Sequence, residues 1–331
     1  MSNTRAGLEA IATVPSISAE DWRKLTVPVR WLIAIRASVL LMTLMSAALG
    51  GLLAWRDGGG DLVPWLLCVL GLSLAHATNN LLNDLTDTKR GVDRGNYYRN
   101  QYGVHVLESG LLSERQFYAY LALTGSAALA VGLLLVNLRG GLTLPLMAAG
   151  AFFVLFYTWP LKYIGLGEPA VLLVWGPLMV GGSYYVTTGQ WSTEAAWLGA
   201  LYGLGPTAVL FGKHIDKIEL DREKGVRTLP VLLGAAKARL GAKLLLLAQY
   251  AGCIALVVAG KEHWSLLAVL AIVPALLKAL RVLSSDKPRE KPGRFPDNLW
   301  PLWFAPHAFA HTRRFMPVFL LALVAAEWLP R

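Results

Sequence analysis

The feature that most constrains this chain of 331 residues is a series of apolar segments, each roughly one bilayer long, that recurs from end to end. A helix of about 20 apolar residues crosses the roughly 30 Å hydrocarbon core of a membrane. The segments are too long and too evenly apolar for the alternating strands of an outer-membrane barrel. The sequence therefore predicts an all-α, polytopic membrane protein.

Nine membrane-spanning helices are expected, and residues 29–331 are predicted to form one transmembrane domain. Residues 1–28 are polar and lack the apolar core of a signal peptide, which predicts a cytoplasmic N-terminal segment. The charged fraction of 16% is too small to cover a soluble domain of this size. The nine predicted spans are approximately Trp31–Trp55, Leu62–Leu82, Phe117–Val136, Leu142–Trp159, Ala170–Thr187, Ala196–Phe211, Leu244–Ala259, Leu266–Leu283 and Phe315–Leu329.

Lys and Arg are distributed unevenly between the two sets of loops, which predicts the orientation of the chain. One set, residues 83–116, 213–243 and 287–294, is strongly basic, whereas the other carries Arg56, Arg139 and Lys261. By the positive-inside rule, the basic loops and the N-terminus face the cytoplasm, at the cytoplasmic (inner) membrane. The net charge of +10 lies between apolar spans rather than on one polar face, so no nucleic-acid partner is expected.

The second span ends in a cluster of acids and asparagines that runs from Asn79 to Asp87. Asp84 and Asp87 are three residues apart and Asn80 precedes Asp84 by four, so these side chains share one face of a helix end. Carboxylate and amide oxygens, with Asp93 just beyond, suit Mg²⁺, which proteins usually hold with one or two carboxylates plus substrate phosphates. Acids at the end of a membrane helix are costly and usually functional, although a solvated helix end is the alternative. Basic residues that can bind a diphosphate follow: Lys89, Arg90, Arg94 and Arg99.

A second polar segment, from Lys213 to Leu229, begins at the end of the sixth span. Its acids are candidate ligands of a second ion, and Lys224 and Arg227 are candidate phosphate contacts. The alternative is an amphipathic interfacial helix with ion pairs four residues apart.

The turn from Tyr157 to Glu168, between the fourth and fifth spans, lies on the same predicted side. Its proline and glycines end helices, and its aromatic residues are also typical of a membrane interface. The Gly199-x-x-x-Gly203 spacing predicts close helix packing. No His/Cys spacing in the chain predicts zinc or haem, and the histidines near spans stand alone: His76, His307 and His311.

These segments, in this order, resemble the UbiA superfamily of intramembrane prenyltransferases, closest to the 1,4-dihydroxy-2-naphthoate prenyltransferase branch of menaquinone synthesis. The resemblance covers about residues 30–235 and includes the nine-helix count. The segments that carry it are Asn83-Asp84-x-x-Asp87-x-x-x-Gly91-Val92-Asp93, Tyr157-Thr158 with Gly165-Leu166-Gly167-Glu168, Gly176-Pro177, Tyr184-Tyr185-Val186-x-x-Gly189, and Asp221-Arg222-x-x-Gly225-x-Arg227-Thr228-Leu229 with Leu233-Gly234.

The resemblance implies Mg²⁺-dependent transfer of a prenyl group from an isoprenyl diphosphate to a hydrophobic or aromatic quinone-precursor acceptor within the lipid bilayer. The implied catalytic residues are Asp84, Asp87, Lys217 and Asp221. The implied Mg²⁺ ligands are Asp84, Asp87, Asp93, Asp216, Glu219 and Asp221. The implied substrate contacts are Asn80, Asn83, Lys89, Arg94, Arg99, Tyr157, Lys213, Lys224 and Arg227.

The chain departs from the family pattern in the second acidic segment. Lys213-His214 stands where the branch has paired asparagines, and in the register set by Asp221 the expected first aspartate falls on Lys217. Lys213, Lys217 and Asp221 would share a helix face, so Lys217 is predicted to contact the diphosphate in place of part of a second Mg²⁺ site. The competing interpretation turns the helix so that Asp216 faces the pocket.

Two further functions are consistent with parts of the pattern. A UbiA-type terpene cyclase, or a carotenoid or lipid prenyltransferase, would use the same ionisation of a diphosphate and change the fate of the cation. An ion-coupled transporter would instead place acids near the bilayer midplane. The acids here cluster at predicted helix ends beside basic loops, which favours the enzyme.

Overall fold

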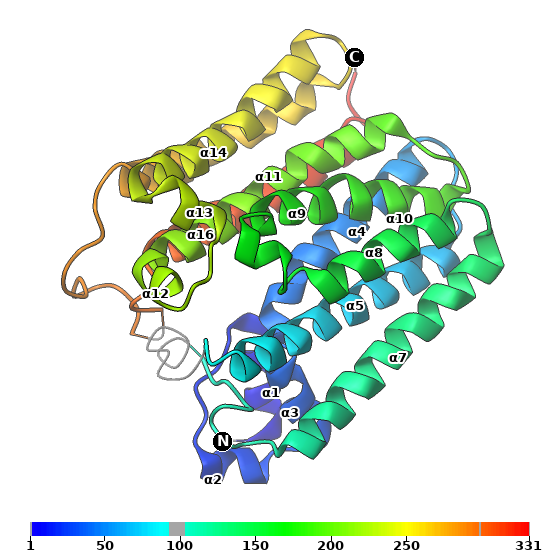
Figure 1. The fold of residues 1–331 in the computed structure, drawn as a ribbon. Helices are drawn as coiled ribbons and strands as arrows, with labels where there is room; N and C mark the ends of the chain where they lie inside the picture. Colours follow the sequence, from blue (N-terminus) through cyan, green and yellow to red (C-terminus); the bar gives the residue numbers. More distant parts are fainter. Residues whose placement is uncertain (1, 93–102, 298, 331) are drawn as a thin grey trace.

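The computed structural model describes residues 2–92, 103–297 and 299–330, and every regular element within them is a helix (Figure 1). The long helices lie side by side in one bundle, with the short N-terminal helices at its lower edge. The elements are α1 (Asn3–Ala12), α2 (Ala19–Lys24), α3 (Val27–Ala34), η1 (Ala37–Leu40), α4 (Leu41–Arg56), α5 (Leu62–Lys89), α7 (Glu114–Arg139), α8 (Thr143–Phe156), η2 (Leu161–Ile164), α9 (Gly167–Leu173), η3 (Val174–Leu178), α10 (Met179–Thr188), α11 (Thr193–Asp216), α12 (Ile218–Glu223), α13 (Leu229–Leu233), α14 (Ala235–Val258), η4 (Trp264–Ile272), α15 (Val273–Leu283) and α16 (Phe304–Ala325).

Eight helical segments in the described part of the chain are long and apolar enough to cross a membrane. They are Ala37–Arg56, Leu62–Lys89, Glu114–Arg139, Gly167–Thr188, Thr193–Asp216, Ala235–Val258, Trp264–Leu283 and Phe304–Ala325. The all-helical membrane fold is therefore confirmed. The remaining predicted span coincides with α8, whose 14 residues extend about 21 Å at 1.5 Å per residue, less than the ~30 Å of hydrocarbon. The count of nine stays a prediction.

The first span begins later than the sequence predicts. Arg36 adopts the left-handed conformation (φ 56°, ψ 56°), which L-residues rarely occupy. This conformation ends α3 and lets the chain start again at Ala37 in a new direction. The expected start at Trp31 was wrong because the apolar residues continue on both sides of Arg36, and hydropathy alone does not show that the helix breaks there.

The last span begins eleven residues before its predicted start at Phe315, because its first turn is capped from another helix. Asp216, the last residue of α11, accepts hydrogen bonds from the backbone N–H groups of Trp303, Phe304 and Ala305 at 2.9, 3.1 and 3.1 Å. A helix start leaves such donors unpaired, and a carboxylate is well suited to satisfy them.

The fifth span is interrupted in its middle. Gly176 has non-helical backbone angles (φ −87°, ψ −115°), and Pro177 has no N–H to donate, so η3 separates α9 from α10. Helix α11 packs tightly against this break, because a Cβ atom on Gly199 or Gly203 would lie 2.9 Å from Gly176 O or 2.8 Å from Leu172 O. The packing role predicted for the Gly199-x-x-x-Gly203 spacing is confirmed.

The N-terminal helices pack onto the bundle rather than extending from it. Ala6 and Trp22 lie in one buried cluster with Leu81 of α5 and Phe117 of α7. In Figure 1 these helices lie at the lower edge, beside the end of α5 and the start of α7. A boundary at residue 28, as the sequence predicts, would fall within α3.

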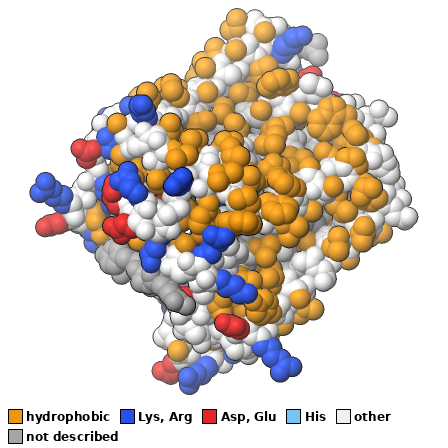
Figure 2. All heavy atoms as spheres, in the orientation of Figure 1, with side chains coloured by type: hydrophobic (Ala, Val, Ile, Leu, Met, Phe, Trp, Pro, Cys, Tyr) orange, Lys and Arg blue, Asp and Glu red, His pale blue; other side chains and the backbone are white. Residues whose placement is uncertain are grey.

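The surface separates into an apolar face and a charged edge. Figure 2 shows apolar side chains across the broad face formed by α7, α8 and neighbouring helices, with most charged side chains along the left and lower edges. On that face Leu123, Leu129, Leu144 and Leu155 are all more than half exposed. Soluble proteins rarely expose so continuous an apolar surface, whereas a face in contact with lipid requires one.

Candidate active site

A cavity of about 600 Å³ lies inside the bundle, lined by α5, α7, α8, the broken helix α9–α10 and α11. Its wall includes Asp87 near one end of α5 and Cys68 far down the same helix. At 1.5 Å per residue these positions are about 28 Å apart, close to the thickness of the hydrocarbon core. The cavity therefore joins a charged end with a long apolar interior lined by residues such as Leu72, Leu135 and Leu146.

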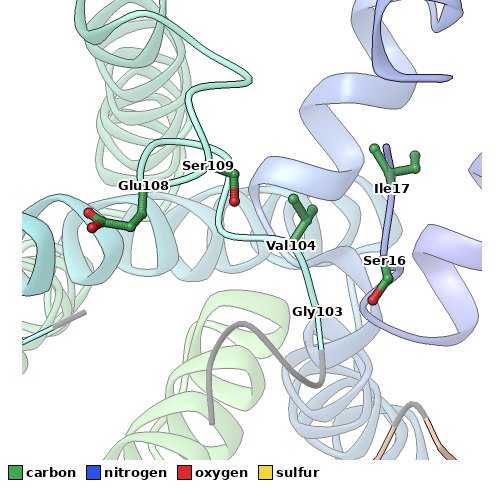
Figure 3. Close-up of a pocket in the computed structure, with 6 residues that line it drawn as sticks. All are labelled: Ser16, Ile17, Gly103, Val104, Glu108 and Ser109. Carbon is green, nitrogen blue, oxygen red and sulfur yellow. The ribbon is translucent and has the colours of Figure 1, made fainter. Parts of the chain in front are cut away.

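A smaller pocket of about 310 Å³ lies between the N-terminal segment and the loop before α7. Figure 3 shows Ser16 and Ile17 on one side and Gly103, Val104, Glu108 and Ser109 on the other, with the Glu108 carboxylate directed away from Ile17. Among the described residues of this lining, the charged side chain is the acid Glu108, which would repel a diphosphate. The larger cavity is therefore the candidate active site.

The first acidic motif meets the turn after α8 at the charged end. Both carboxylate oxygens of Asp87 lie 2.7 Å from Lys162 Nζ. The Asn83 amide donates to Asp87 Oδ2 and to Thr158 Oγ1, each at 3.3 Å. Asp87, Lys162 and Asn83 all line the cavity, together with Tyr157. The structure thus places two segments 75 residues apart in sequence on one polar wall.

Asp84 lies beside Arg36, a residue that the sequence analysis missed. The Arg36 guanidinium is 3.4 Å from Asp84 Oδ1 and donates to the backbone and side-chain oxygens of Asn80 at 3.1 and 3.2 Å. The left-handed backbone of Arg36 turns this side chain toward the cavity, where Nε is enclosed without a partner among the described residues. The available signal was an arginine in an otherwise apolar run, which is costly in a membrane and usually functional.

The second acidic motif reaches the same end of the cavity through Lys213, His214, Lys217 and Asp221. The sequence predicted one continuous helix here, and the structure instead has a break at Lys217 (φ −116°, ψ 11°) between α11 and α12. Lys213, Lys217 and Asp221 nevertheless line one cavity, and Lys217 Nζ lies 3.6 Å from Asp221 Oδ1. Asp216 instead caps α16, so we leave it out of the site that we propose.

Other candidate residues lie outside this wall. Glu219 is exposed and accepts a hydrogen bond from Arg222 at 2.7 Å, so it too is left out of the proposed site. Lys89 Nζ lies over the Tyr118 ring, 5.2 Å from the ring centroid. Arg227 is exposed. Asp93, Arg94 and Arg99 fall outside the described residues.

Lys224 links the two motifs at the protein surface. It is exposed, and its Nζ donates to the carbonyl oxygen of Gly91, directly after α5, at 3.2 Å. This contact joins the end of α12 to the segment that follows the first motif. Lys224 therefore lies near the charged end of the bundle without lining the cavity wall.

Glu168 of α9 contacts both α11 and α13 next to the charged end of the cavity. One carboxylate oxygen lies 2.6 Å from His214 Nδ1, and the other accepts from Leu229 N at 3.3 Å. Both side chains of the Glu168–His214 pair are buried. Since a carboxylate only accepts hydrogen bonds, His214 carries a hydrogen on Nδ1 and is held in a fixed orientation at the cavity surface.

The donor atoms at the charged end fit an Mg²⁺ ion shared with a phosphate ligand. Among the described residues no three Asp, Glu, His or Cys side chains converge to enclose a metal by themselves. Asp87 and the Asn80 and Asn83 amides supply hard oxygens from the cavity wall, and Asp84 lies buried beside Arg36 one helical turn before Asp87. Mg²⁺ is usually completed by water and substrate phosphates. Among the described residues that line the cavity, the basic Arg36, Lys162, Lys213 and Lys217 outnumber the acids Asp87 and Asp221, which suits an anionic substrate.

Comparison with known proteins identifies the family. Residues 43–305 match the model of the UbiA prenyltransferase family, which is well over half of the chain. The chain belongs to the UbiA family. It is therefore a membrane-embedded UbiA-type prenyltransferase, an enzyme class that takes its prenyl group from an isoprenyl diphosphate. Its relatives include the 1,4-dihydroxy-2-naphthoate octaprenyltransferase of Escherichia coli, 30% identical over 77% of this chain and 85% of that protein.

Solved structures confirm the UbiA fold. An apo UbiA homologue from Aeropyrum pernix K1 superposes with a TM-score of 0.64 at 18% identity, covering 87% of this chain and 97% of that one. A UbiA homologue from Archaeoglobus fulgidus bound to DMAPP and Mg²⁺ superposes with a TM-score of 0.55 at 16% identity, covering 89% of this chain and 99% of that one.

Proposed function

We propose that this UbiA-type enzyme transfers a prenyl group to an aromatic quinone precursor of the 1,4-dihydroxy-2-naphthoate class. The observation that carries the proposal is one cavity with a cationic, carboxylate-bearing end and an apolar interior almost as long as the bilayer is thick. The Escherichia coli relative, named for transfer to 1,4-dihydroxy-2-naphthoate, supports this choice of acceptor.

The diphosphate of the donor occupies the charged end in this proposal. Lys162 of η2 supplies positive charge, as do Lys213 and Lys217 at the end of α11, and Arg36 supplies a planar guanidinium that can bind two oxygens at once. Asp84 and Asp87 would hold Mg²⁺, which when bound neutralises the diphosphate. The Archaeoglobus fulgidus homologue bound to DMAPP and Mg²⁺ supports this metal.

The prenyl chain lies in the apolar interior. The C–O bond of the allylic diphosphate breaks, and the diphosphate leaves with the electron pair. A carbon of the electron-rich acceptor ring then forms a bond to the first prenyl carbon, and the ring loses a proton or CO₂. Apolar walls protect the allylic cation because they exclude water.

We further propose that the charged end faces the cytoplasm, at the inner membrane. The polar ends of α5 and α11 both carry basic segments, whereas the opposite loops carry few Lys or Arg residues. The positive-inside rule assigns the basic side to the cytoplasm. The soluble diphosphate product would then be released where it can be hydrolysed or reused.

Incubation of the purified protein with Mg²⁺, a labelled prenyl diphosphate and 1,4-dihydroxy-2-naphthoate tests the proposal. The expected product has the mass of a prenylated naphthoquinol, and chelation of Mg²⁺ abolishes its formation. A cyclised hydrocarbon formed without use of the acceptor would refute the proposed transfer and favour a cyclase. No release of diphosphate with any acceptor would refute the enzyme assignment.

A further inference from the structure

The wall of the cavity carries a polar cluster about halfway along its length, formed by Thr43, His76 and Trp175. Thr43 Oγ1 lies 2.8 Å from His76 Nδ1 and 3.2 Å from Trp175 Nε1. The His76 and Trp175 rings meet edge to face, with centroids 5.1 Å apart and planes at 81°. His76 and Trp175 line the cavity, whereas Thr43 is fully buried behind them.

These contacts define which nitrogen of His76 carries the hydrogen. The Trp175 indole N–H can only donate, so Thr43 Oγ1 accepts from it. The Thr43 hydroxyl hydrogen is buried, and His76 Nδ1 is the acceptor that the described residues offer it. An unpaired buried hydroxyl is costly, so Thr43 donates to Nδ1 and the neutral imidazole carries its hydrogen on Nε2.

The Nε2–H group faces the interior of the cavity. No atom of the described residues accepts a hydrogen bond from it, yet Nε2 is not among the polar atoms that are enclosed without a partner. It is therefore accessible from the cavity that His76 lines. A hydrogen-bond donor in an apolar channel, with no acceptor in the part of the chain that the structure describes, is suited to an oxygen atom of a ligand.

The surrounding backbone holds this donor in place. The carbonyl oxygen of Trp175, at the break between α9 and α10, accepts from Ser46 Oγ at 2.8 Å. Tyr202 Oη donates to the carbonyl of Met42, next to Thr43, at 2.7 Å. Both contacts fix the elements that carry Thr43 and Trp175, so the cluster is organised before any ligand binds.

The position of His76 matches the place where an acceptor ring would lie. On α5 it precedes Asp84 by eight residues, which is about 12 Å at 1.5 Å per residue. That distance leaves room for an aromatic ring beside the first carbons of a prenyl chain whose diphosphate lies at the charged end. A prenyl tail alone has no oxygen for this donor to bind.

We propose that His76 Nε2–H binds an oxygen atom of the aromatic acceptor and that Trp175 packs against its ring. This inference rests on the proposed function and adds a specificity-determining residue to it. The ligand chemistry is an aromatic ring with a hydroxyl, carbonyl or carboxylate oxygen. A neutral donor in an apolar wall binds such an oxygen without adding a second positive charge near the allylic cation.

Calorimetric titration of the purified full-length protein in nanodiscs tests the proposal. The probes are 1-hydroxy-2-naphthoate for the acceptor site and dimethylallyl diphosphate with Mg²⁺ for the donor site. His76→Phe keeps a ring and removes the N–H, so the Kd for 1-hydroxy-2-naphthoate should rise about tenfold or more. The Kd for dimethylallyl diphosphate should stay within about twofold of the wild type, since this ligand needs no contact with Nε2.

His76→Gln is the matched variant, because its amide N–H can replace the donor and recover at least part of the affinity. If His76→Phe does not fold, Thr43→Val tests the same point, since it removes the group that fixes the hydrogen on Nε2. Thr43→Val should then weaken the binding of 1-hydroxy-2-naphthoate and leave the binding of dimethylallyl diphosphate unchanged. Unchanged acceptor affinity in the variant that folds, or equal weakening of both probes, would overturn the inference.

The outcomes separate this inference from the proposed function. Binding of 1-hydroxy-2-naphthoate that depends on His76, without prenylation of any naphthoate, would refute the proposed function and retain the aromatic site. Prenylation with acceptor affinity independent of His76 would refute the aromatic site alone. If the wild type does not bind 1-hydroxy-2-naphthoate at all, the aromatic site is also refuted.

Discussion

Two adjacent residues at the end of α11 should affect different properties when they are replaced, one the stability of the fold and the other the affinity for the diphosphate. Asp216 caps α16 through three backbone hydrogen bonds, whereas Lys217 lines the cavity beside Asp221. Hydrogen bonds to a charged group contribute about 1.5–3 kcal/mol each, and they are not fully additive. We therefore expect Asp216→Ala to lower the free energy of unfolding by about 3–5 kcal/mol and to leave the affinity of the folded protein for a prenyl diphosphate nearly unchanged.

Lys217→Gln should instead reduce substrate affinity more than it reduces stability. Loss of one charged contact to a diphosphate corresponds to about a 10- to 100-fold rise in Kd. The ion pair with Asp221 is long, at 3.6 Å, and the glutamine amide can still donate to the Asp221 carboxylate, so stability should change less than in Asp216→Ala. Lys217→Arg is the matched control, because it keeps the positive charge.

Both quantities can be measured on the same samples. Cys253 is free and fully buried, so in a background with Cys68 of the cavity wall replaced, a maleimide dye that reacts only after unfolding reports the thermal midpoint. Calorimetry with dimethylallyl diphosphate reports affinity at several Mg²⁺ concentrations. If Asp216→Ala lost affinity while its midpoint stayed unchanged, and Lys217→Gln bound normally, the assignment of the two residues would be reversed.

Three further predictions concern the metal site, the buried wall and the orientation. Asp84→Ala and Asp87→Ala should abolish diphosphate release while the protein still inserts and folds, and near-normal turnover of either variant at limiting Mg²⁺ would contradict the proposed ligands. Glu168→Ala should lower the thermal midpoint, because it leaves His214 Nδ1 and the Leu229 N–H without their acceptor, at a cost of about 1–3 kcal/mol for each group; an unchanged midpoint would show that the pair is dispensable. The orientation can be tested with Ser109→Cys and Glu223→Cys in a background with Cys68 and Cys253 replaced. Both variants should react with an impermeant maleimide from the cytoplasmic side only. Labelling from opposite sides would exclude a shared active site.

The sequence predicted the helices well because the signal for a membrane helix is local. Apolar runs have no alternative structure in a bilayer, and the acids at the end of α5 occur in one continuous stretch. The same locality explains the errors. The early start of α16 depends on Asp216, about 90 residues earlier in the chain, and the break at Arg36 depends on contacts with α5.

The residues of the proposed site that the sequence did not indicate come from separate elements. Lys162 lies in a turn that was singled out for its proline, glycines and aromatic residues, and only the packing of that turn against α5 brings its Nζ to Asp87. His76 had no neighbour in sequence that indicated a role. Its position beside Thr43 and Trp175 depends on three helices, which no local pattern can specify.

The central claim is that diphosphate and prenyl chain occupy the two ends of one cavity, and a single variant can test it. Gly182 lies on the apolar wall, where an added Cβ atom would meet only Leu146 Cδ1 at 3.9 Å, so Gly182→Leu should fold while filling part of the channel. The measurement is the ratio of prenyl transfer from octaprenyl diphosphate to that from dimethylallyl diphosphate. We predict that this ratio falls by about tenfold or more in Gly182→Leu, because only the long chain reaches that depth. An unchanged ratio would contradict the placement of the prenyl chain in this cavity.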